Sequence, residues 1–205
     1  MSFYSRLFAQ AYDRMTHDIE QNLFSPIRKS LLKDAEEPIL EIGSGTGANI
    51  PFFPDVESGN RPKRIYLERS PWMMDKFMEK GFGTKGYPLT ASGSSLPFRA
   101  GSFRTVIATL VLCSIQEVDA PLSEIVRVLE PGGIFLSFEH VASQNLWMRG
   151  LQGLLTPVWK YLAEGCHLNR ETDRAIGQLL SMKRGGIITH FGTPFVWGVY
   201  QKEKP

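Results

Sequence analysis

The chain has 205 residues, 42% of them hydrophobic and 21% charged, which is typical of a single soluble globular domain with a substantial core. Its 23 basic and 21 acidic side chains leave a net charge of +2, which is too small to indicate a nucleic-acid partner. Because there are only two cysteines, no apolar run near 18 residues and no signal-peptide pattern, we expect one domain (1–205) without a transmembrane segment, located in the cytoplasm with reduced thiols.

The first predicted elements are two amphipathic helices within residues 3–32. Apolar side chains recur at helical spacing from Tyr4 to Met15 and again from Ile19 onwards. The plainest interpretation is that these helices pack on the core. A lid over a site and a weak contact with a membrane surface are the alternatives, and we treat residues 1–34 as an N-terminal helical cap.

A buried strand at 38–42 is followed directly by a glycine-rich turn. Glycine stands at alternate positions, Gly43, Gly45 and Gly47. Because glycine accepts positive φ and lets a ligand approach the backbone closely, we expect a sharp turn into a helix with a flat, polar cofactor against it. A glycine-rich connection that binds no ligand is the alternative.

The middle of the chain alternates between strand and helix patterns. We expect strands at 64–68, within 84–91, at 103–109 and at 134–138, and helices at 71–80 and 118–129. Ser70 is a predicted N-cap and Gly81 a predicted stop for the first of these helices, and the sequence at 130–133 ends the second. Strands that alternate with crossover helices pair in parallel, and ligands bind at the carboxyl ends of such strands.

The last third begins with a mostly helical stretch at 142–182 and ends with a hairpin, with strands at 187–191 and 195–200. An apolar stripe runs from Trp147 to Leu162, and such a stripe usually packs into a core. Here it follows the carboxyl end of a strand, so we expect a helical insertion that covers the substrate. The predicted fold is therefore α/β: a Rossmann-like, seven-stranded, mostly parallel sheet with helices on both faces and an antiparallel C-terminal strand.

An acidic residue, Glu68, stands at the end of the second predicted strand. Its carboxylate can accept hydrogen bonds from both hydroxyls of a ribose beside the glycine turn. The number of residues between Gly47 and Glu68 is close to the spacing of the glycine turn and the acidic residue in dinucleotide-binding folds. The spacing G-x-G-x-G lacks the third glycine of the dinucleotide pattern. Glu41, just before the turn, would repel a pyrophosphate but could hold an ammonium group. These residues favour S-adenosylmethionine over NAD and leave NAD as the alternative.

Four motifs, in this order and spacing, resemble the class I S-adenosylmethionine-dependent methyltransferases over residues 35–141. They are Leu40-Glu41-Ile42-Gly43-Ser44-Gly45-Thr46-Gly47, Glu68 with Ser70-Pro71, Leu96-Pro97-Phe98, and Arg127-Val128-Leu129-Glu130-Pro131-Gly132-Gly133. A further set, extending to about residue 174, resembles the methyltransferase-like-seven group, membrane-associated enzymes that methylate small alkyl thiols. It comprises Gly47-Ala48-Asn49, Thr109-Leu110-Val111-Leu112-Cys113-Ser114, Glu139-His140-Val141 and Gly165-Cys166-His167-Leu168-Asn169-Arg170-Glu171.

The chain departs from these patterns in three ways. We do not find the N-terminal membrane anchor of that group, so its localisation does not carry over. The stretch between the last two strands looks shortened, which could open the substrate side. Residues 92–95 carry no acid for the adenine amino group, so adenine recognition there would depend on backbone groups or hydroxyls.

The resemblance implies a set of cofactor-binding residues. By this likeness, the methionine part of the cofactor lies against the glycine turn, its ribose on Glu68, and its adenine between the second and third strands. Residues directly after the fourth strand form the floor of the cofactor site. The residues are Glu41, Gly43, Ser44, Gly45 and Gly47 for the methionine part, Glu68 for the ribose, Arg69, Met73, Gly93 and Ser94 for the adenine, and Thr109 and Leu110 for the floor. A methionine on a helix is also a common core residue, so Met73 keeps that alternative.

Methyl transfer is an in-line displacement in which positioning does most of the work. A thiolate is intrinsically reactive, whereas an oxygen or amine acceptor needs a well-placed base. We predict His140 and Glu139, at the end of the fifth strand, as the catalytic pair, with a capped strand end as the alternative for His140. The other candidates are Tyr12, Asp13, Glu164 and His167.

Other chemistry receives little support from the sequence. Cys166-His167 suggests a nucleophile or a metal ligand, but no further cysteine or paired histidine stands at ligand spacing, so we expect no metal site, and Cys113 looks like core. The chain has no nucleophile elbow, phosphate-binding lysine loop or zinc-protease motif.

We therefore predict methyl transfer from S-adenosylmethionine, with S-adenosylhomocysteine as product, to a small molecule, first an apolar alkyl thiol. A lipid or quinone-type acceptor is the next hypothesis. An NAD-dependent oxidoreductase and a non-catalytic cofactor-binding protein remain as alternatives from other classes.

Overall fold

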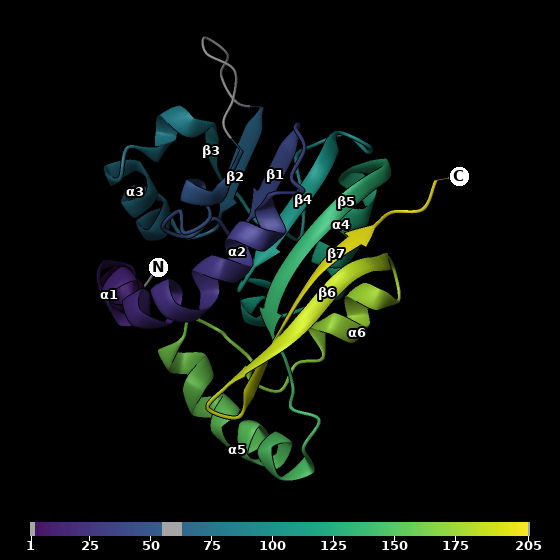
Figure 1. Cartoon of the computed structure of the whole chain (residues 1–205). Helices are drawn as coiled ribbons and strands as arrows, with labels where there is room; N and C mark the ends of the chain where they lie inside the picture. Colours follow the sequence, from purple (N-terminus) through teal and green to yellow (C-terminus); the bar gives the residue numbers. More distant parts are fainter. Residues whose placement is uncertain (1–2, 55–62, 205) are drawn as a thin grey trace.

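A seven-stranded sheet forms the centre of the computed structural model, which describes residues 3–54 and 63–204 (Figure 1). Its strands are β1 (Ile39–Ile42), β2 (Arg64–Glu68), β3 (Tyr87–Thr90), β4 (Phe103–Thr109), β5 (Leu129–His140), β6 (Ser181–His190) and β7 (Thr193–Gln201). The order is β3-β2-β1-β4-β5-β7-β6, with parallel pairing up to β5 and with β7 antiparallel to both of its neighbours. The predicted fold class is confirmed.

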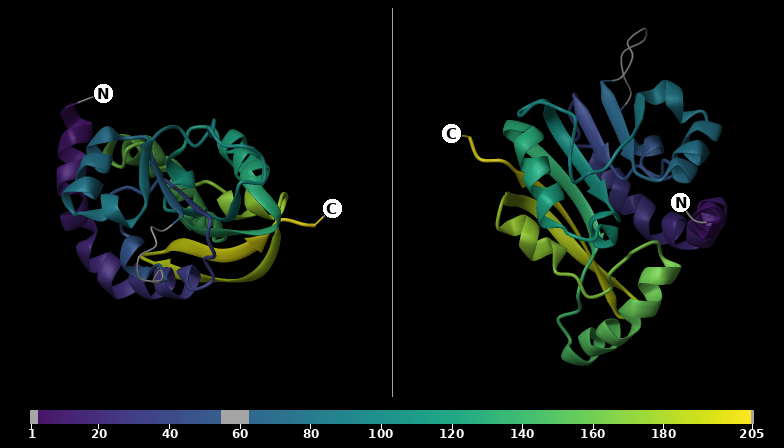
Figure 2. Two further views of the ribbon diagram at one scale, coloured as in Figure 1. Left: turned by 90° about the horizontal axis from the view of Figure 1, so that it is seen from above. Right: turned by 180° about the vertical axis from the view of Figure 1, so that it is seen from behind.

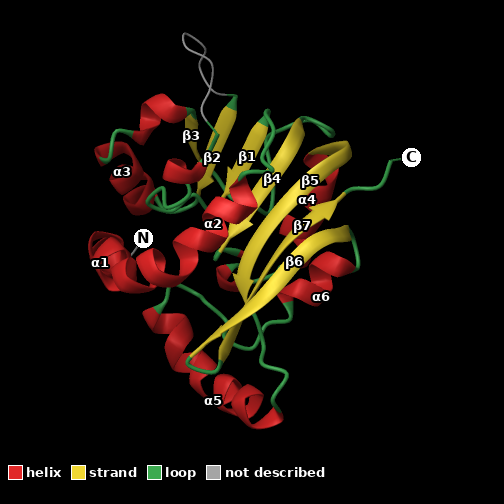
Figure 3. Ribbon diagram, viewed as in Figure 1, coloured by secondary structure: helices red, strands yellow, loops and turns green. Residues whose placement is uncertain are grey.

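Helices cover both faces of this sheet (Figures 2 and 3). They are α1 (Phe3–Ile19), α2 (Ser25–Leu32), α3 (Pro71–Glu79), α4 (Asp119–Val128), α5 (Leu146–Leu162) and α6 (Thr172–Gly177). A π-helical turn η1 (Glu20–Phe24) joins α1 to α2, and the 3₁₀ turns are η2 (Ile50–Phe52), η3 (Phe82–Lys85) and η4 (Leu112–Ser114). One buried apolar cluster joins the sheet to α2 and α3, and a second joins its other face to α4 and α6.

The structure differs from the predicted elements in three places. Strand β6 begins at Ser181, six residues before the predicted strand at 187–191, because its early part pairs with the end of β7. The other two differences also have a local cause. The glycine turn leads into no α-helix before residue 54, because its glycines adopt left-handed φ and Pro51 lacks the N–H that a helix needs. Strand β5 begins at Leu129, earlier than predicted, because Leu129 pairs with Phe103 before a shift in register. Gly132, with φ of 79°, lies within this early part of the strand.

Elements from both ends of the chain meet at the carboxyl ends of the parallel strands, where the tip of the β6–β7 hairpin also extends toward α5 (Figure 1). Helix α1 contacts the end of α5, since the Tyr4 hydroxyl donates to the Leu162 carbonyl at 2.7 Å and the Tyr4 ring stacks on Tyr161. Residues 142–182 contain α5 and α6 joined by a non-helical connection at 163–171. Among the described residues, none of the helices combines the length and the apolar character that crossing a bilayer requires.

Candidate functional site

The glycine turn is shaped by three left-handed residues. Gly43, Gly45 and Gly47 have φ of 69°, 55° and 88°. A Cβ on Gly43 would lie 2.2 Å from a Val111 methyl, and one on Gly47 would lie 2.4 Å from the Phe82 ring, whereas one on Gly45 would meet no atom within 4 Å. Gly43 and Gly47 therefore allow close packing, and Gly45 leaves open space above the turn for a ligand.

Glu68 reaches from the end of β2 across to this turn. Its Oε2 accepts from the Gly45 amide at 3.0 Å and its Oε1 from the Ser70 amide at 2.7 Å. Burial raises the pKa of this carboxyl group, and the backbone N–H donors oppose that shift. The carboxylate is thus held beside the glycine turn, at the carboxyl end of β2.

Glu41 lies below the turn in a buried polar network. Its Oε1 accepts from Asn49 Nδ2 at 2.9 Å, and the same amide nitrogen donates to Thr109 Oγ1 at 2.9 Å. Arg28 Nη1 donates to Asn49 Oδ1 and to Thr109 Oγ1, at 2.7 and 2.8 Å. On its other side Arg28 pairs with Glu20 at 2.6 Å, from the π-helical turn. Burial raises the pKa of Glu41 to about 7, against the lowering effects of Asn49 and Arg28.

The other predicted cofactor residues vary in burial. Gly93 is buried, and a Cβ there would lie 2.9 Å from an Ile42 methyl. Met73 is half-buried at the start of α3, while Arg69 and Ser94 are exposed. Leu110 follows β4 with φ of 56°, and its amide donates to the Phe138 carbonyl at 2.7 Å.

The residues around the turn fit a polar ligand that carries a positive charge. Among the described residues, Glu41 Oε2 and Ser44 Oγ are buried polar atoms without a hydrogen-bond partner. A buried carboxylate oxygen without a donor is costly, and an ammonium group can satisfy it. With the open space above Gly45 and the Glu68 carboxylate beside it, the site has the parts that an amino acid linked to a nucleoside needs.

Glu139 holds the loop that follows β4. It is buried, its Oε1 accepts from the amides of Val111 and Leu112 at 3.0 and 2.9 Å, and its Oε2 accepts from the Cys113 amide at 3.2 Å. Burial raises the pKa of Glu139, while the three amides lower it. Since both carboxylate oxygens accept hydrogen bonds from backbone amides, Glu139 fixes the conformation of the loop at residues 111–113.

Next to it, His140 lies within a cluster that the sequence did not indicate. Its Nδ1 is 3.8 Å from Cys166 Sγ, which in turn is 3.7 Å from Cys113 Sγ. We refer to these three residues as the Cys113–His140–Cys166 cluster. The thiol contact raises the pKa of Cys113 and lowers that of Cys166. His140 Nε2 is buried, and no group in the described ranges bonds to it.

The remaining base candidates are spread around this edge of the sheet. Asp13 accepts from Thr46 Oγ1 at 2.5 Å and pairs with Lys80 at 2.7 Å, so α1 is tied directly to the glycine turn. Burial raises the pKa of Tyr12 to about 12. Glu164 is exposed, and a ring nitrogen of His167 lies 3.2 Å from the Cys113 carbonyl oxygen.

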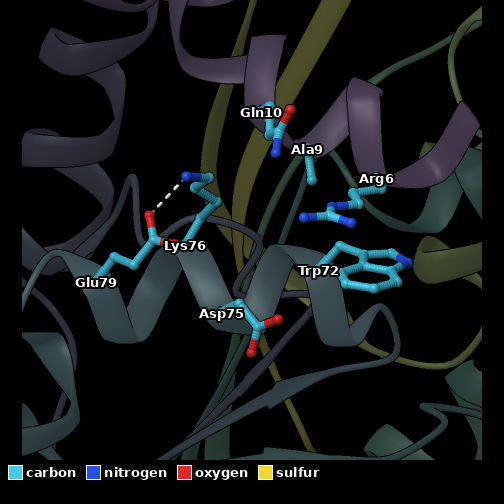
Figure 4. Close-up of a pocket in the computed structure, with 7 residues that line it drawn as sticks. All are labelled: Arg6, Ala9, Gln10, Trp72, Asp75, Lys76 and Glu79. Carbon is cyan, nitrogen blue, oxygen red and sulfur yellow. Dashed lines mark hydrogen bonds and ion pairs between the residues drawn. The ribbon is translucent and has the colours of Figure 1, made fainter. Parts of the chain in front are cut away.

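A small hollow lies between α1 and α3, and the seven residues that line it come from these two helices and not from the glycine turn (Figure 4). Its volume is about 100 Å³, and the Arg6 guanidinium lies 5.4 Å from the centre of the Trp72 ring within it. Pockets for small organic ligands measure roughly 300–1,000 Å³, so this hollow does not correspond to the cofactor site.

Sequence reasoning missed Arg28 and Asn49, which connect Glu41 to Thr109. Arg28 lies on an amphipathic helix, where arginine usually faces solvent, yet only 3% of it is exposed. A signal was available for Asn49, because this polar residue stands two positions after Gly47, in the Gly47-Ala48-Asn49 motif. Nothing local marked Arg28.

The strand order, the glycine turn and the acid at the end of β2 define a class I S-adenosylmethionine-dependent methyltransferase, and S-adenosylmethionine is its cofactor. A family model described as a methyltransferase domain matches residues 40–137. The chain is 34% identical over 181 residues to thiol S-methyltransferase TMT1B of Rattus norvegicus, covering 83% of this chain and 70% of that protein. It is 32% identical over 197 residues to thiol S-methyltransferase TMT1A of Homo sapiens, covering 93% and 78%.

The chain therefore belongs to the methyltransferase family that includes TMT1A and TMT1B. The fold likeness extends over almost the whole chain. A chain in the complex of the Haloferax volcanii Trm112 methyltransferase activator with a methyltransferase superposes with a TM-score of 0.72 at 16% identity, covering 97% of this chain and 98% of that one. These comparisons favour the S-adenosylmethionine interpretation of the glycine turn over the NAD alternative.

Proposed function

We propose that this methyltransferase acts on a small apolar thiol. The observation that carries the proposal is the composition of the acceptor side, where sulfur and imidazole lie at the ends of β4 and β5 while the neighbouring carboxylate of Glu139 is engaged by amides. A thiol becomes reactive on losing its proton and needs no strong base, in contrast to an alcohol. The names of the TMT1A and TMT1B relatives point in the same direction.

For the cofactor, we propose the following arrangement. When bound, S-adenosylmethionine supplies an electrophilic methyl group. Glu41 Oε2 and the turn at Gly43, Ser44, Gly45 and Gly47 would hold its amino acid, and Glu68 would accept from the ribose hydroxyls. Arg69, Met73, Gly93 and Ser94 would border the adenine, and Thr109 and Leu110 would form the floor.

In this proposal His140 and Glu139 have different roles. The imidazole of His140 would receive the thiol proton. Glu139 would act as a positioning residue, because its carboxylate fixes the loop that carries Cys113. The polar network around Arg28 would keep Glu41 in place below the turn.

Transfer of an isotopically labelled methyl group to a panel of alkyl thiols tests the substrate class. We expect labelled thioethers from apolar thiols and little product from matched alcohols and amines. Labelled product from the alcohols but not from the thiols would overturn the proposal.

Calorimetry with S-adenosylhomocysteine tests the cofactor residues. Loss of a hydrogen bond to a charged group costs about 1.5–3 kcal/mol, so Glu68→Gln is expected to weaken binding about 10- to 100-fold. Glu79→Gln, on the exposed side of α3, is the matched control and should bind like the unchanged chain. Equal affinity of both variants would remove Glu68 from the site.

A lipid or quinone-type acceptor is the second candidate, and the exposed face of α5 favours it. Much of the apolar stripe that the sequence assigned mainly to a core is exposed to solvent instead: Trp147 and Leu154 are 75% and 76% exposed, and Leu155, Trp159 and Leu162 are 43–48% exposed. Leu146, Val158 and Tyr161 on the same helix are 63–83% exposed. Such a patch suits an apolar substrate or weak contact with a membrane surface. We further infer a reducing compartment such as the cytoplasm, since both cysteines are free thiols.

A further inference from the structure

Two cysteine thiols and one histidine imidazole, all possible metal ligands, come from distant segments and meet at the ends of β4 and β5. Cys113 lies in η4 after β4, His140 ends β5, and Cys166 lies in the connection after α5. One ligand atom from each residue lies within 4.8 Å of the corresponding atoms of the other two. In the part of the chain that the structure describes, no other group of three or more His, Cys, Asp or Glu residues is arranged for metal binding.

The backbone around these ligands is fixed by contacts that do not involve the ligand atoms. Glu139 accepts from the Cys113 amide, and the Cys113 carbonyl accepts from the His167 amide at 2.9 Å. The Arg170 guanidinium donates to the carbonyls of Leu112, at 2.7 Å, and Ile115. The segments that carry Cys113 and Cys166 are therefore joined before any metal binds, so little ordering would be needed on binding.

A second contact brings the Cys166 segment close to η4. Gly165 has φ of 99°, and a Cβ there would lie 2.9 Å from the Ser114 carbonyl oxygen. Only glycine fits this backbone approach without displacement. Position 165 thus places the next side chain, Cys166, directly against Cys113.

Two of the three ligand separations match tetrahedral coordination, and the third, between Cys113 and His140, lies within 4.8 Å. Two thiolates about 2.3 Å from one zinc ion lie about 3.8 Å apart at the tetrahedral angle, and a thiolate and an imidazole nitrogen lie about 3.6 Å apart. The observed separations are 3.7 Å for the two sulfurs and 3.8 Å for Cys166 Sγ and His140 Nδ1. A disulfide would require about 2.05 Å. We propose that the Cys113–His140–Cys166 cluster binds a single zinc-type divalent ion.

Three protein ligands leave one tetrahedral position for another ligand, as in catalytic rather than structural zinc sites. Cys113 and His140 are buried, whereas Cys166 is partly exposed, so access to a free position would be from the side of Cys166. Resting on the proposed function, this position would take the acceptor thiol. Its sulfur binds the ion, its proton leaves to solvent, and no electron is transferred. With the ion bound, His140 would serve as a ligand and solvent would take the thiol proton that the imidazole would receive in the metal-free chain.

Metal content and cobalt spectroscopy test the site directly. The full chain, purified with a reductant and dialysed against zinc, is expected to retain about one ion per chain. Replacement by Co²⁺ should give intense tetrahedral visible bands and a sulfur-to-cobalt charge-transfer band. Addition of an alkyl thiol should shift these bands if the fourth position takes a thiol. Unshifted bands would overturn the thiol-ligand step and leave the metal site standing.

Variants identify the ligands. Cys113→Ser, Cys166→Ser and His140→Gln should each lose most of the zinc, while His17→Gln, on exposed α1, should keep it. S-adenosylhomocysteine affinity shows whether each variant is folded, and any variant that fails to bind is replaced by its Cys→Ala or His→Asn counterpart.

Zinc content far below one ion per reduced chain, or retained in all three ligand variants, would overturn the site, and so would a Cys113–Cys166 disulfide in the purified protein. If zinc-free protein still methylates thiols at the full rate, the proposed function stands and zinc has no part in the reaction. If zinc binds but no thiol is methylated, the site stands and the proposed function fails.

Discussion

The proposed cofactor side of the sheet edge, at the glycine turn and Glu68, and the proposed acceptor side, at the Cys113–His140–Cys166 cluster, differ in how their polar groups are brought together. On the cofactor side, Glu41 and the turn at 43–49 come from one short segment, to which the neighbouring strand adds Glu68 and more distant segments add Arg28 and Thr109. On the acceptor side, 53 residues separate Cys113 from Cys166, and His140 comes from a third segment. A short segment of sequence can therefore specify most of the proposed cofactor site. The proposed acceptor side depends instead on how several distant segments pack against one another.

The largest expected effect comes from Arg28, which lies in α2 and connects Glu20 of the π-helical turn to Asn49 and Thr109. Removing one member of a buried ion pair costs about 3–5 kcal/mol, so Arg28→Met should lower the free energy of unfolding by about this amount in urea titrations. Arg104 pairs with Glu36 and Glu130 at the surface and provides the control. Arg104→Met should cost about 0–1 kcal/mol. Equal losses in both would show that the Arg28 network is not stabilising.

Substitutions at two glycines of the turn distinguish a position that needs close packing, Gly43, from one that leaves space for a ligand, Gly45. Gly43→Ala and Gly45→Ala should each lower the free energy of unfolding by about 1–2 kcal/mol, because alanine is strained at a left-handed φ. Only Gly43→Ala should lower the free energy of unfolding by a further 1–3 kcal/mol or so, because its new Cβ would overlap with the Val111 side chain. Gly45→Ala should instead reduce S-adenosylhomocysteine affinity, measured by calorimetry. The opposite ranking in urea titrations would contradict the packing described for the turn.

A smaller effect is expected from the protonation of Glu41. Because burial raises its pKa from 4.5 to about 7, the folded chain holds this proton more tightly than the unfolded chain. Its contribution to the free energy of unfolding should therefore fall as pH rises from about 4.5 to about 7, and level off above. Glu68 and Glu139 also have raised pKa values, so the informative quantity is the difference between the unchanged chain and Glu41→Gln.

Cofactor affinity should respond in the opposite direction. The ionised carboxylate of Glu41 would bind the ammonium group, so affinity should rise with pH up to about 7, and binding should release a proton. Calorimetry in two buffers of different ionisation enthalpy measures that proton. The absence of proton release at pH 6 would place the ammonium group elsewhere.

The smallest effect on stability is expected on α5. Trp147 and Leu154 are 75% and 76% exposed, so Trp147→Ser with Leu154→Ser should change the unfolding free energy by no more than about 0.5 kcal/mol. The KM for apolar acceptors should rise if α5 covers the substrate. An unfolding loss of several kcal/mol would mean that this face packs on a core in solution.

The sequence by itself determined the β1 strand, the glycine turn, the position of Glu68 and the reversed C-terminal strand. These follow from hydrophobic period and from glycine, whose φ freedom is a local property. The tertiary structure alone decided that Arg28 is buried, that Glu139 holds the loop after β4, and that Cys113, His140 and Cys166 meet. Such contacts depend on packing between segments far apart in the chain, and residue type and spacing within one segment do not specify them.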